Sequence, residues 1–288
     1  MNNVKHILIT GSNGLIGDAL VEQLQDKTLF QLFGISRSLN KKESTFVLDL
    51  STNWSDDILP KKIDVVIHLA QSEKFRDFPE SANEVFQVNT LSTLKLLEYA
   101  RKAGAKKFIY ASSGGVYGNS DIGFNEESPL QPNMDLGFYL TTKFSSELLV
   151  GNYVTFFDIN ILRFFFVFGK KQKKNMLIPR LIEAVKNEDS IKLQGEDGIK
   201  INPVYVDDAA KAIIEIIKKE GSYNVNIGGA EILSIKSISE IIGKQLNKTP
   251  LFEYQAVEAK NLIGDISKMK GLHKPITSFE EAIKLMLE

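Results

Sequence analysis

The stretch 6-HILITGSNGLIGDAL-20 decides the fold of this chain. An apolar run leads into three glycines, Gly11, Gly14 and Gly17, and an apolar-patterned stretch follows them. Because glycine has no Cβ, the first allows a tight turn, the second lets a ligand approach the backbone, and the third lets a helix pack closely on a strand. A strand, a glycine loop and a helix N-terminus in this order predict a binding site for the pyrophosphate of a dinucleotide.

The composition excludes several classes of protein. The 288 residues include 35 basic and 36 acidic side chains, so the net charge of −1 gives no electrostatic reason to expect nucleic acid or an anionic membrane as a partner. The absence of cysteine excludes disulfides, thiolate nucleophiles and cysteine-ligated metals, and it fits the cytoplasmic location that we expect. The longest apolar run, residues 161–169, is far too short to span a membrane, and no signal peptide is evident. We expect no metal site.

Short apolar runs alternate with longer helical patterns over the first 170 residues. The predicted strands are residues 6–10, 29–36, 44–50, 64–70, 107–113 and 157–169, and the predicted helices are residues 14–24, 83–104 and 137–150. Strands that are apolar throughout are typical of a parallel sheet covered on both faces. The alternation predicts an α/β fold with a Rossmann-type doubly wound parallel sheet and right-handed crossovers.

The pattern changes after Gly169. A basic run follows at residues 170–174, which we interpret as a solvated loop, with a role near a substrate phosphate as the alternative. The later elements are a helix at 176–187, a strand at 190–195, a strand and helix at 202–221 in which Asp207 or Asp208 is the predicted N-cap, a strand at 222–229, and helices at 234–246 and 278–287.

Two domains are predicted from this change of pattern. Residues 1–169, with a returning segment of about 203–228, should form the dinucleotide-binding domain. Residues 170–202 and 229–288 should form a smaller C-terminal substrate lobe. No Pro/Gly/Ser-rich linker separates the two, so we expect them to pack together with the substrate in the cleft between them.

The end of the second predicted strand bears on which dinucleotide binds. An acidic residue there would bind the ribose 2′-hydroxyl of NAD. The chain instead has Ser36, Arg37 and Ser38, and an arginine with two hydroxyl donors suits the 2′-phosphate of NADP. We therefore expect NADP(H), with NAD possible if Arg37 is an ordinary surface residue. Asp49, after the third strand, either meets the adenine or ends its strand in a turn.

A tyrosine and a lysine form the predicted catalytic pair. Tyr139 and Lys143 are four residues apart on a predicted helix, so they share one face. A phenol with a pKa of about 10 exchanges its proton more readily when an ammonium group stabilises the phenolate. Ser112 and Ser113 end the fifth predicted strand, at the sheet edge where α/β proteins bind ligands. Ser113 can donate to a substrate oxygen while Tyr139 transfers the proton.

The chain resembles the extended short-chain dehydrogenase/reductases, and among them the NAD(P)-dependent epimerase/dehydratase family that acts on nucleotide sugars. The motifs that carry the resemblance are TGSNGLIG (10–17), HLA (68–70), VNTLSTLKLLEYAR (88–101), ASSGGVYG (111–118), YLTTK (139–143), ILRFFFVFG (161–169), VYVDDAAKAI (204–213) and YNVNIGG (223–229). The resemblance implies Ser113, Tyr139 and Lys143 as catalytic residues and a nucleotide sugar as substrate. It also implies a homodimer formed through the helices at 83–104 and 137–150.

The same motifs give the binding residues that we expect. Those expected at the cofactor are Gly11, Asn13, Gly14, Leu15, Ile16, Gly17, Ser36, Arg37, Ser38, Asp49, Leu50, Leu69, Ala70, Asn89, Tyr139 and Lys143. Those expected at the substrate are Ser112, Ser113, Tyr117, Phe166 and Lys200. His68 is expected to line the cofactor site or the core.

Four departures from the family pattern narrow the reaction. Gly114 and Gly115 stand where dehydratases carry an Asp-Glu pair, which argues against dehydration. The absence of cysteine argues against an epimerase–reductase that resembles GDP-fucose synthase. Phe166 replaces an Asn that can contact the substrate. Ile201, with Lys200 beside it, stands where an Arg often grips the substrate diphosphate.

Four functions are compatible with these residues. We expect NADPH-dependent reduction of a nucleotide-linked 4-keto or 4-keto-6-deoxy sugar, because Arg37 favours NADP(H) and a reductase consumes a hydride at each turnover. A nucleotide-sugar 4-epimerase, which keeps its NAD bound, is the first alternative. A reductase of a non-nucleotide ketone or aldehyde and a non-catalytic NADP(H)-binding regulator are the others. The regulator would have no reason to keep Ser113, Tyr139 and Lys143 in register.

Overall fold

A sheet of seven parallel strands is the centre of the structure, a computed structural model that describes residues 4–24, 28–39, 43–130 and 136–288. The strand order is β11-β6-β5-β4-β1-β2-β3. The bounds are Lys5–Thr10 for β1, Phe30–Ser36 for β2, Ser44–Val47 for β3, Val65–His68 for β4, Lys107–Ser113 for β5, Asp158–Phe164 for β6 and Tyr223–Ile227 for β11. The predicted α/β fold with a doubly wound parallel sheet is confirmed.

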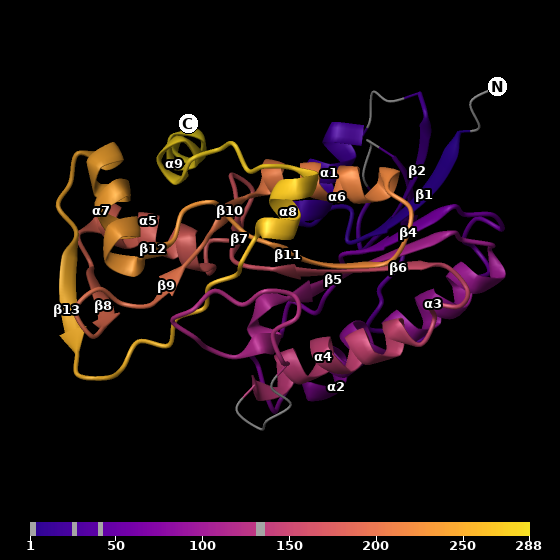
Figure 1. The fold of residues 1–288 in the computed structure, drawn as a ribbon, viewed down its shortest axis with the longest axis horizontal. Helices are drawn as coiled ribbons and strands as arrows, with labels where there is room; N and C mark the ends of the chain where they lie inside the picture. The colour runs from indigo at the N-terminus through magenta and orange to yellow at the C-terminus, as the bar shows by residue number, and fades with distance from the viewer. Residues whose placement is uncertain (1–3, 25–27, 40–42, 131–135) are drawn as a thin grey trace.

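Helices cover both faces of this sheet (Figure 1). On one face lie α1 (Leu15–Leu24) and α6 (Val206–Lys218), which pack against each other. On the other lie α2 (Ala82–Phe86), a π-helical turn (Gln87–Leu91), α3 (Ser92–Lys102) and α4 (Gly137–Gly151). Burial on both faces explains why the strands are apolar throughout, and all four residues of β4 are buried.

The sheet has its topological switch between β1 and β4. From β1 the chain builds outward through β2 to β3, and then it crosses back to place β4 on the other side of β1. Neighbouring connections therefore leave the carboxyl ends of β1 and β4 in opposite directions, which opens a crevice for a ligand at that edge. The glycine loop that follows Thr10 lies at this crevice.

Two predicted elements are interrupted in the structure. The apolar run 157–169 is divided into β6 and β7 (Val167–Phe168), because Phe166 has a left-handed backbone with φ of 48°. The predicted helix 83–104 contains the π-helical turn, a distortion that often marks a functional site. The strand predicted at 44–50 ends earlier, at Val47.

The predicted cap of α6 is wrong. Tyr205 is the N-cap residue, and its side chain makes no capping bond. Asp208 is buried, and its carboxylate accepts hydrogen bonds from the N–H groups of Ile276 and Thr277 at 3.2 and 2.9 Å and from His273 Nε2 at 3.0 Å. This carboxylate therefore ties α6 to the C-terminal segment instead of capping its own helix.

The elements after β7 gather mostly at one end of the molecule, on the left of Figure 1. They include α5 (Leu177–Asn187), β8 (Ser190–Gln194), β9 (Lys200–Ile201), β12 (Leu233–Ser234), α7 (Ile235–Leu246), β13 (Leu251–Gln255) and α9 (Phe279–Leu287). Helix α8 (Ser267–Leu272) lies nearer the middle of the molecule (Figure 1), where it packs on α6 and β11. The short strand β10 (Val204–Tyr205) pairs with β7, and β11 returns to the large sheet beside β6. The division into two domains stays a prediction. In the described part of the chain, no helix has the length and apolar character needed to cross a membrane.

Candidate active site

The glycine loop forms a cradle with no room for side chains. Gly11 has φ of 69°, and a Cβ there would lie 3.0 Å from the backbone nitrogen of Ala70. A Cβ on Gly17 would collide with the carbonyl oxygen of Gly11, and one on Gly14 would lie 3.0 Å from that oxygen. Helix α1 begins at Leu15, so the N–H groups of its first turn point to the loop. The cradle therefore fits the pyrophosphate of a dinucleotide.

Polar side chains gather at the carboxyl end of β2. Nδ2 of Asn13 donates to Ser36 Oγ at 3.0 Å and to the carbonyl oxygen of Ser38 at 2.9 Å. Nη2 of Arg37 lies 2.5 Å from Glu73 Oε1, and Lys173 Nζ lies 2.7 Å from the other oxygen of that carboxylate. Arg37 is thus paired within the protein, on a side chain that is 60% exposed.

Asp49 lies in an exposed turn after β3, and its contact with adenine stays a prediction. Its Oδ1 accepts hydrogen bonds from the N–H and the hydroxyl of Ser51 at 2.9 and 2.7 Å, and these bonds lower the pKa of Asp49. The carboxylate therefore closes the turn after β3, as in the alternative interpretation of the sequence. Leu50, which follows it, is buried in the core.

Tyr139 and Lys143 both lie on α4, but their polar ends contact different groups. The Tyr139 hydroxyl donates to Gln71 Oε1 at 2.7 Å, and the ring packs on Phe75 with the centroids 5.0 Å apart. Lys143 is buried, and its Nζ donates to the carbonyl oxygen of Ala111 in β5 at 2.9 Å. Both residues lie on the one helix that the sequence predicted for them, and their catalytic role stays a prediction.

Burial acts on the two groups in opposite senses. It raises the pKa of the Tyr139 hydroxyl, because the phenolate loses hydration. It lowers the pKa of Lys143 to about 7, opposed by the carboxylate of Glu147 one turn along the helix. Both shifts favour the neutral side chains.

The two serines at the end of β5 differ in their surroundings. Ser113 is half-buried, and its Oγ accepts a hydrogen bond from the N–H of Gly115 at 3.2 Å. Ser112 is buried, and its hydroxyl has no hydrogen-bonding partner among the described residues. Ser113 is therefore the better placed of the two to meet a ligand.

His68 and Asn89 are core residues in this structure, which is one of the two places expected for His68, whereas Asn89 was expected at the cofactor. His68 hydrogen-bonds Thr10 and Thr93 with its two ring nitrogens at 2.7 and 2.9 Å. Burial lowers its pKa to about 3, so the imidazole is neutral. Asn89 is 1% exposed, and its amide accepts from the N–H of Ser72 at 2.9 Å. Both side chains hold the frame of the site and do not reach into it.

A buried polar network lies beneath α4. Arg163 is fixed by both oxygens of Glu147, with Nε at 3.1 Å and Nη2 at 2.7 Å. Its Nη1 donates to the hydroxyl of Tyr117 at 2.6 Å, and that hydroxyl donates to Asn226 Oδ1 at 2.9 Å. Tyr117 is 1% exposed, so the expected contact with substrate is not available to its hydroxyl.

Phe166 and Ile201, which depart from the family pattern, and Lys200 beside Ile201 differ in their exposure to solvent. Phe166 is partly buried and packs on the core. Ile201 is fully buried in that core, whereas Lys200 before it is exposed. Of the two residues near the expected diphosphate grip, only Lys200 can meet a ligand.

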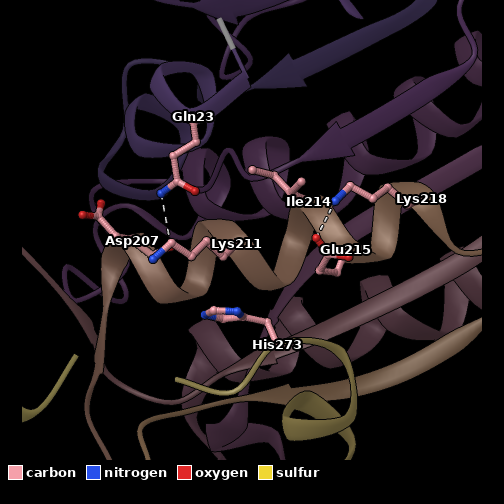
Figure 2. Close-up of a pocket in the computed structure, with 7 residues that line it drawn as sticks. All are labelled: Gln23, Asp207, Lys211, Ile214, Glu215, Lys218 and His273. Atoms are coloured by element: carbon pink, nitrogen blue, oxygen red, sulfur yellow. Dashed lines mark hydrogen bonds and ion pairs between the residues drawn. The ribbon is translucent and has the colours of Figure 1, made fainter. Parts of the chain in front are cut away.

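A surface pocket of about 470 Å³ lies away from these residues. Figure 2 shows that α6 carries most of its lining, with Gln23 on one side and His273 on the other. Nε2 of Gln23 donates to the carbonyl oxygen of Asp207 at 3.2 Å, and Lys218 pairs with Glu215 at 2.5 Å. The pocket contains none of the predicted site residues. In the described part of the chain, no three His, Asp or Glu side chains are grouped to hold a metal ion.

The comparisons with known proteins agree with the glycine loop and the sheet. A model of the NAD dependent epimerase/dehydratase family matches residues 7–228. The chain belongs to this family, and it is therefore an enzyme. The UDP-glucuronate 4-epimerase of Thermodesulfobacterium geofontis is 33% identical over 230 residues, which are 77% of this chain and 71% of that one.

Two further similar proteins are a reductase and a 4-epimerase. The dTDP-4-dehydro-6-deoxyglucose reductase of Escherichia coli is 26% identical over 291 residues, with 92% of this chain and 89% of that one covered. The crystal structure of UDP-glucuronic acid 4-epimerase from Bacillus cereus, in complex with UDP-glucuronic acid and NAD, is 26% identical with a TM-score of 0.87. That match covers 98% of this chain and 97% of the other.

Sequence reasoning missed the segment that follows β4. Gln71 meets the Tyr139 hydroxyl, Glu73 pairs with Arg37, and Phe75 packs on the Tyr139 ring. The signal available was their position: they follow HLA, at the carboxyl end of a parallel strand beside the glycine loop, where ligands bind.

Proposed function

We propose that this enzyme interconverts the C4 epimers of a nucleotide sugar with a dinucleotide cofactor that stays bound. The observation that carries the proposal is the meeting of the glycine loop, the end of β5 at Ser113 and the Tyr139 hydroxyl at one edge of the sheet, beside the β1–β4 switch. Similarity to two 4-epimerases, over 77% and 98% of this chain, supports epimerisation.

The chain's own residues would move the protons. The cradle of Gly11, Gly14 and Gly17 would hold a dinucleotide, which would supply a reversible hydride acceptor for the sugar carbon. Tyr139 would take the proton of the sugar hydroxyl during oxidation and give a proton back during reduction. Ser113 would donate its hydroxyl proton to a hydrogen bond with the same sugar oxygen. Oxidation and reduction at the same carbon cancel, so the reaction would consume no cofactor, and addition to the opposite face of the carbonyl would give the epimer.

Lys143 would respond to the cofactor. Its pKa of about 7 leaves the ammonium and amine forms in balance at neutral pH. Ribose hydroxyls that accept hydrogen bonds from Nζ would favour the ammonium form, and the ammonium would in turn stabilise the Tyr139 phenolate. We infer that Lys143 acts on the Tyr139 proton through its charge.

Steric evidence argues against dehydration. A Cβ on Gly114 would lie 2.5 Å from the ring of Phe165, and one on Gly115 would lie 2.9 Å from the methyl groups of Leu140. An acidic side chain in either place would therefore displace its neighbour. Dehydration needs such a group to protonate the leaving hydroxyl. We therefore propose that the enzyme oxidises and reduces one carbon of the sugar and eliminates no water.

NADPH-dependent reduction of a 4-keto sugar is the second candidate, and Arg37 favours it. No acidic residue follows β2, and Ser36, Arg37 and Ser38 offer donors suited to a 2′-phosphate. Similarity to a dTDP-4-dehydro-6-deoxyglucose reductase supports this reaction. For the phosphate to bind, Arg37 would have to exchange its partner Glu73 for it.

The cofactor that leaves the protein distinguishes the two candidates. Purified protein is denatured, and the released nucleotide is identified by mass spectrometry. Epimerisation predicts NAD in near one-to-one ratio, and conversion of UDP-glucuronic acid or UDP-glucose to its 4-epimer without added cofactor. Reduction predicts instead that NADPH is consumed with dTDP-4-dehydro-6-deoxyglucose. Failure of all three sugars would refute a nucleotide sugar of these kinds as the substrate.

We also propose a homodimer formed through α2–α3 and α4. Phe86, Leu94 and Leu148 on these helices are 50%, 36% and 59% exposed, and α4 contacts both α2 and α3, so an interface here would bury apolar side chains from all three helices. Light scattering should give twice the chain mass of 32.2 kDa. Leu148→Lys should reduce that mass to one chain, and a monomeric wild type would contradict the proposal.

A further inference from the structure

We propose that Gln71 is a positioning residue, which aims the Tyr139 hydroxyl and sets its acidity. The inference rests on the proposed function, in which this hydroxyl carries the proton. Gln71 Oε1 accepts the hydrogen bond of that hydroxyl at 2.7 Å. Among the residues that the structure describes, Gln71 is its one hydrogen-bonding partner.

Buried hydrogen bonds hold the backbone on both sides of the Gln71–Tyr139 contact, although the Gln71 side chain itself is exposed. Asn89 Oδ1 accepts from the N–H of Ser72, next to Gln71, at 2.9 Å. The other end of the same amide, Nδ2, donates to Thr142 Oγ1 at 3.0 Å, and Thr142 donates to the carbonyl oxygen of Tyr139 at 2.7 Å. One buried amide therefore fixes the backbone at both ends of the Gln71–Tyr139 hydrogen bond.

Ring packing restricts the phenol further. The Tyr139 ring contacts Phe75, and the preceding residue, Phe138, stacks on Phe78 with centroids 5.0 Å apart and ring planes 21° apart. The segment from Gln71 to Phe78 thus covers the start of α4 with two aromatic pairs. A phenol held in this way can turn its hydroxyl only over a small arc, and Gln71 lies on that arc.

A carboxamide suits a partner that gains and loses a proton. Its oxygen accepts from the neutral phenol, and rotation of the amide plane by about 180° presents Nε2–H to the phenolate. A carboxylate at the same place would accept from the phenol but repel the phenolate, so it would raise the Tyr139 pKa. An apolar side chain would serve neither state. Gln71 can therefore stabilise Tyr139 before and after proton transfer.

Variants at Gln71 and at a matched control separate these effects. Gln71→Met keeps the length of the side chain and removes the hydrogen bond, and Gln71→Glu adds a charge. Gln31 is exposed in β2, and Gln31→Met and Gln31→Glu make the same changes at a distance from the carboxyl edge of the sheet. Each protein is made with 13Cζ-labelled tyrosine, and Tyr139→Phe identifies the Tyr139 resonance.

The first expected result concerns the hydrogen bond and turnover. Gln71→Met should move the Tyr139 resonance at pH 7 and lower kcat by about tenfold or more, with the cofactor Kd within about twofold of wild type. Gln31→Met should change neither quantity. A resonance that stays in place, or a kcat within about twofold of wild type, would overturn the assignment.

The second expected result concerns pH. In Gln71→Glu, the limb of the kcat profile that belongs to Tyr139 should move to higher pH by about one unit, whether the tyrosine acts as acid or as base. Gln31→Glu should leave the limb in place. If Tyr139→Phe is inactive and the limb does not move in Gln71→Glu, the role of Gln71 is refuted but the proposed function is not. If Tyr139→Phe keeps its activity, the proposed function is refuted as well.

Discussion

Burial of Lys143 should make the stability of the ligand-free protein depend on pH in a predictable direction. The pKa of Lys143 is lowered from 10.5 to about 7 in the folded chain, chiefly by desolvation. Between these values the unfolded chain binds a proton that the folded chain does not, so the free energy of unfolding rises with pH. The stabilisation is complete above pH 10.5 and is lost as the pH falls through 7.

The size of this change in unfolding free energy can be worked out for the pH range that is accessible to experiment. Of the range from pH 6 to pH 9, about two pH units lie above the folded pKa, where the lysine is neutral in the folded chain and charged in the unfolded one. At 1.36 kcal/mol per unit this corresponds to roughly 2–3 kcal/mol. Lys143→Met removes the titrating group. The difference in unfolding free energy, wild type minus Lys143→Met, should therefore rise by on the order of 2 kcal/mol across this range.

Urea denaturation of cofactor-free protein, measured at half-unit steps of pH, gives that difference directly. Lys192→Met, in an exposed position on β8, is the control because it makes the same substitution at a lysine that is not buried. Its difference from wild type should stay flat. A flat curve for Lys143→Met as well, or one that falls with rising pH, would refute the claim that burial holds this lysine near neutrality.

Three further perturbations test other parts of the structure. Arg163→Met leaves the Glu147 carboxylate buried without its partner and should lower the unfolding free energy by about 3–5 kcal/mol, whereas the double variant with Glu147→Met should lose less; chemical denaturation compares the two. Gly114→Ala brings a Cβ to 2.5 Å from the Phe165 ring, and calorimetry should show a loss of stability. The loss should be about 1–3 kcal/mol, and an unchanged melting temperature would contradict this packing. Because burial holds the pKa of His68 at about 3, acidification from pH 6.5 to 4 should destabilise wild type by on the order of 3 kcal/mol more than His68→Gln; equal slopes would count against a neutral buried imidazole.

Local signals explain why much of the fold could be predicted. The glycine loop, the apolar strands and the periodic helices each carry their signal within about ten residues. The break between β6 and β7 could not be found in this way, because Phe165 and Phe166 continue an apolar run and nothing in residue type marks the left-handed conformation of Phe166. The N-cap of α6 was also mistaken, since Asp208 has partners more than 60 residues away.

In the candidate site, too, contacts between residues far apart in the sequence could not be predicted. Tyr139, Lys143 and Ser113 were recognisable because their spacing and strand-end positions are local. The partner of Tyr139 was not, because Gln71 lies 68 residues earlier and only the tertiary fold joins them. The pairing of Arg37 with Glu73 depends likewise on two loops that meet over the glycine cradle. Strand-end position indicates which segments line the site, but the contacts between them need the structure.

The acid–base role of Tyr139 on a bound dinucleotide is tested by one comparison, Tyr139→Phe against wild type. Cofactor affinity is measured by fluorescence titration, and turnover is measured with the nucleotide sugar that the wild type converts. The account predicts a Kd within about twofold and a loss of turnover of about 100-fold or more, because the aromatic ring stays while the hydroxyl that carries the proton is removed. A variant that keeps wild-type turnover, or one that no longer binds the cofactor, would contradict it.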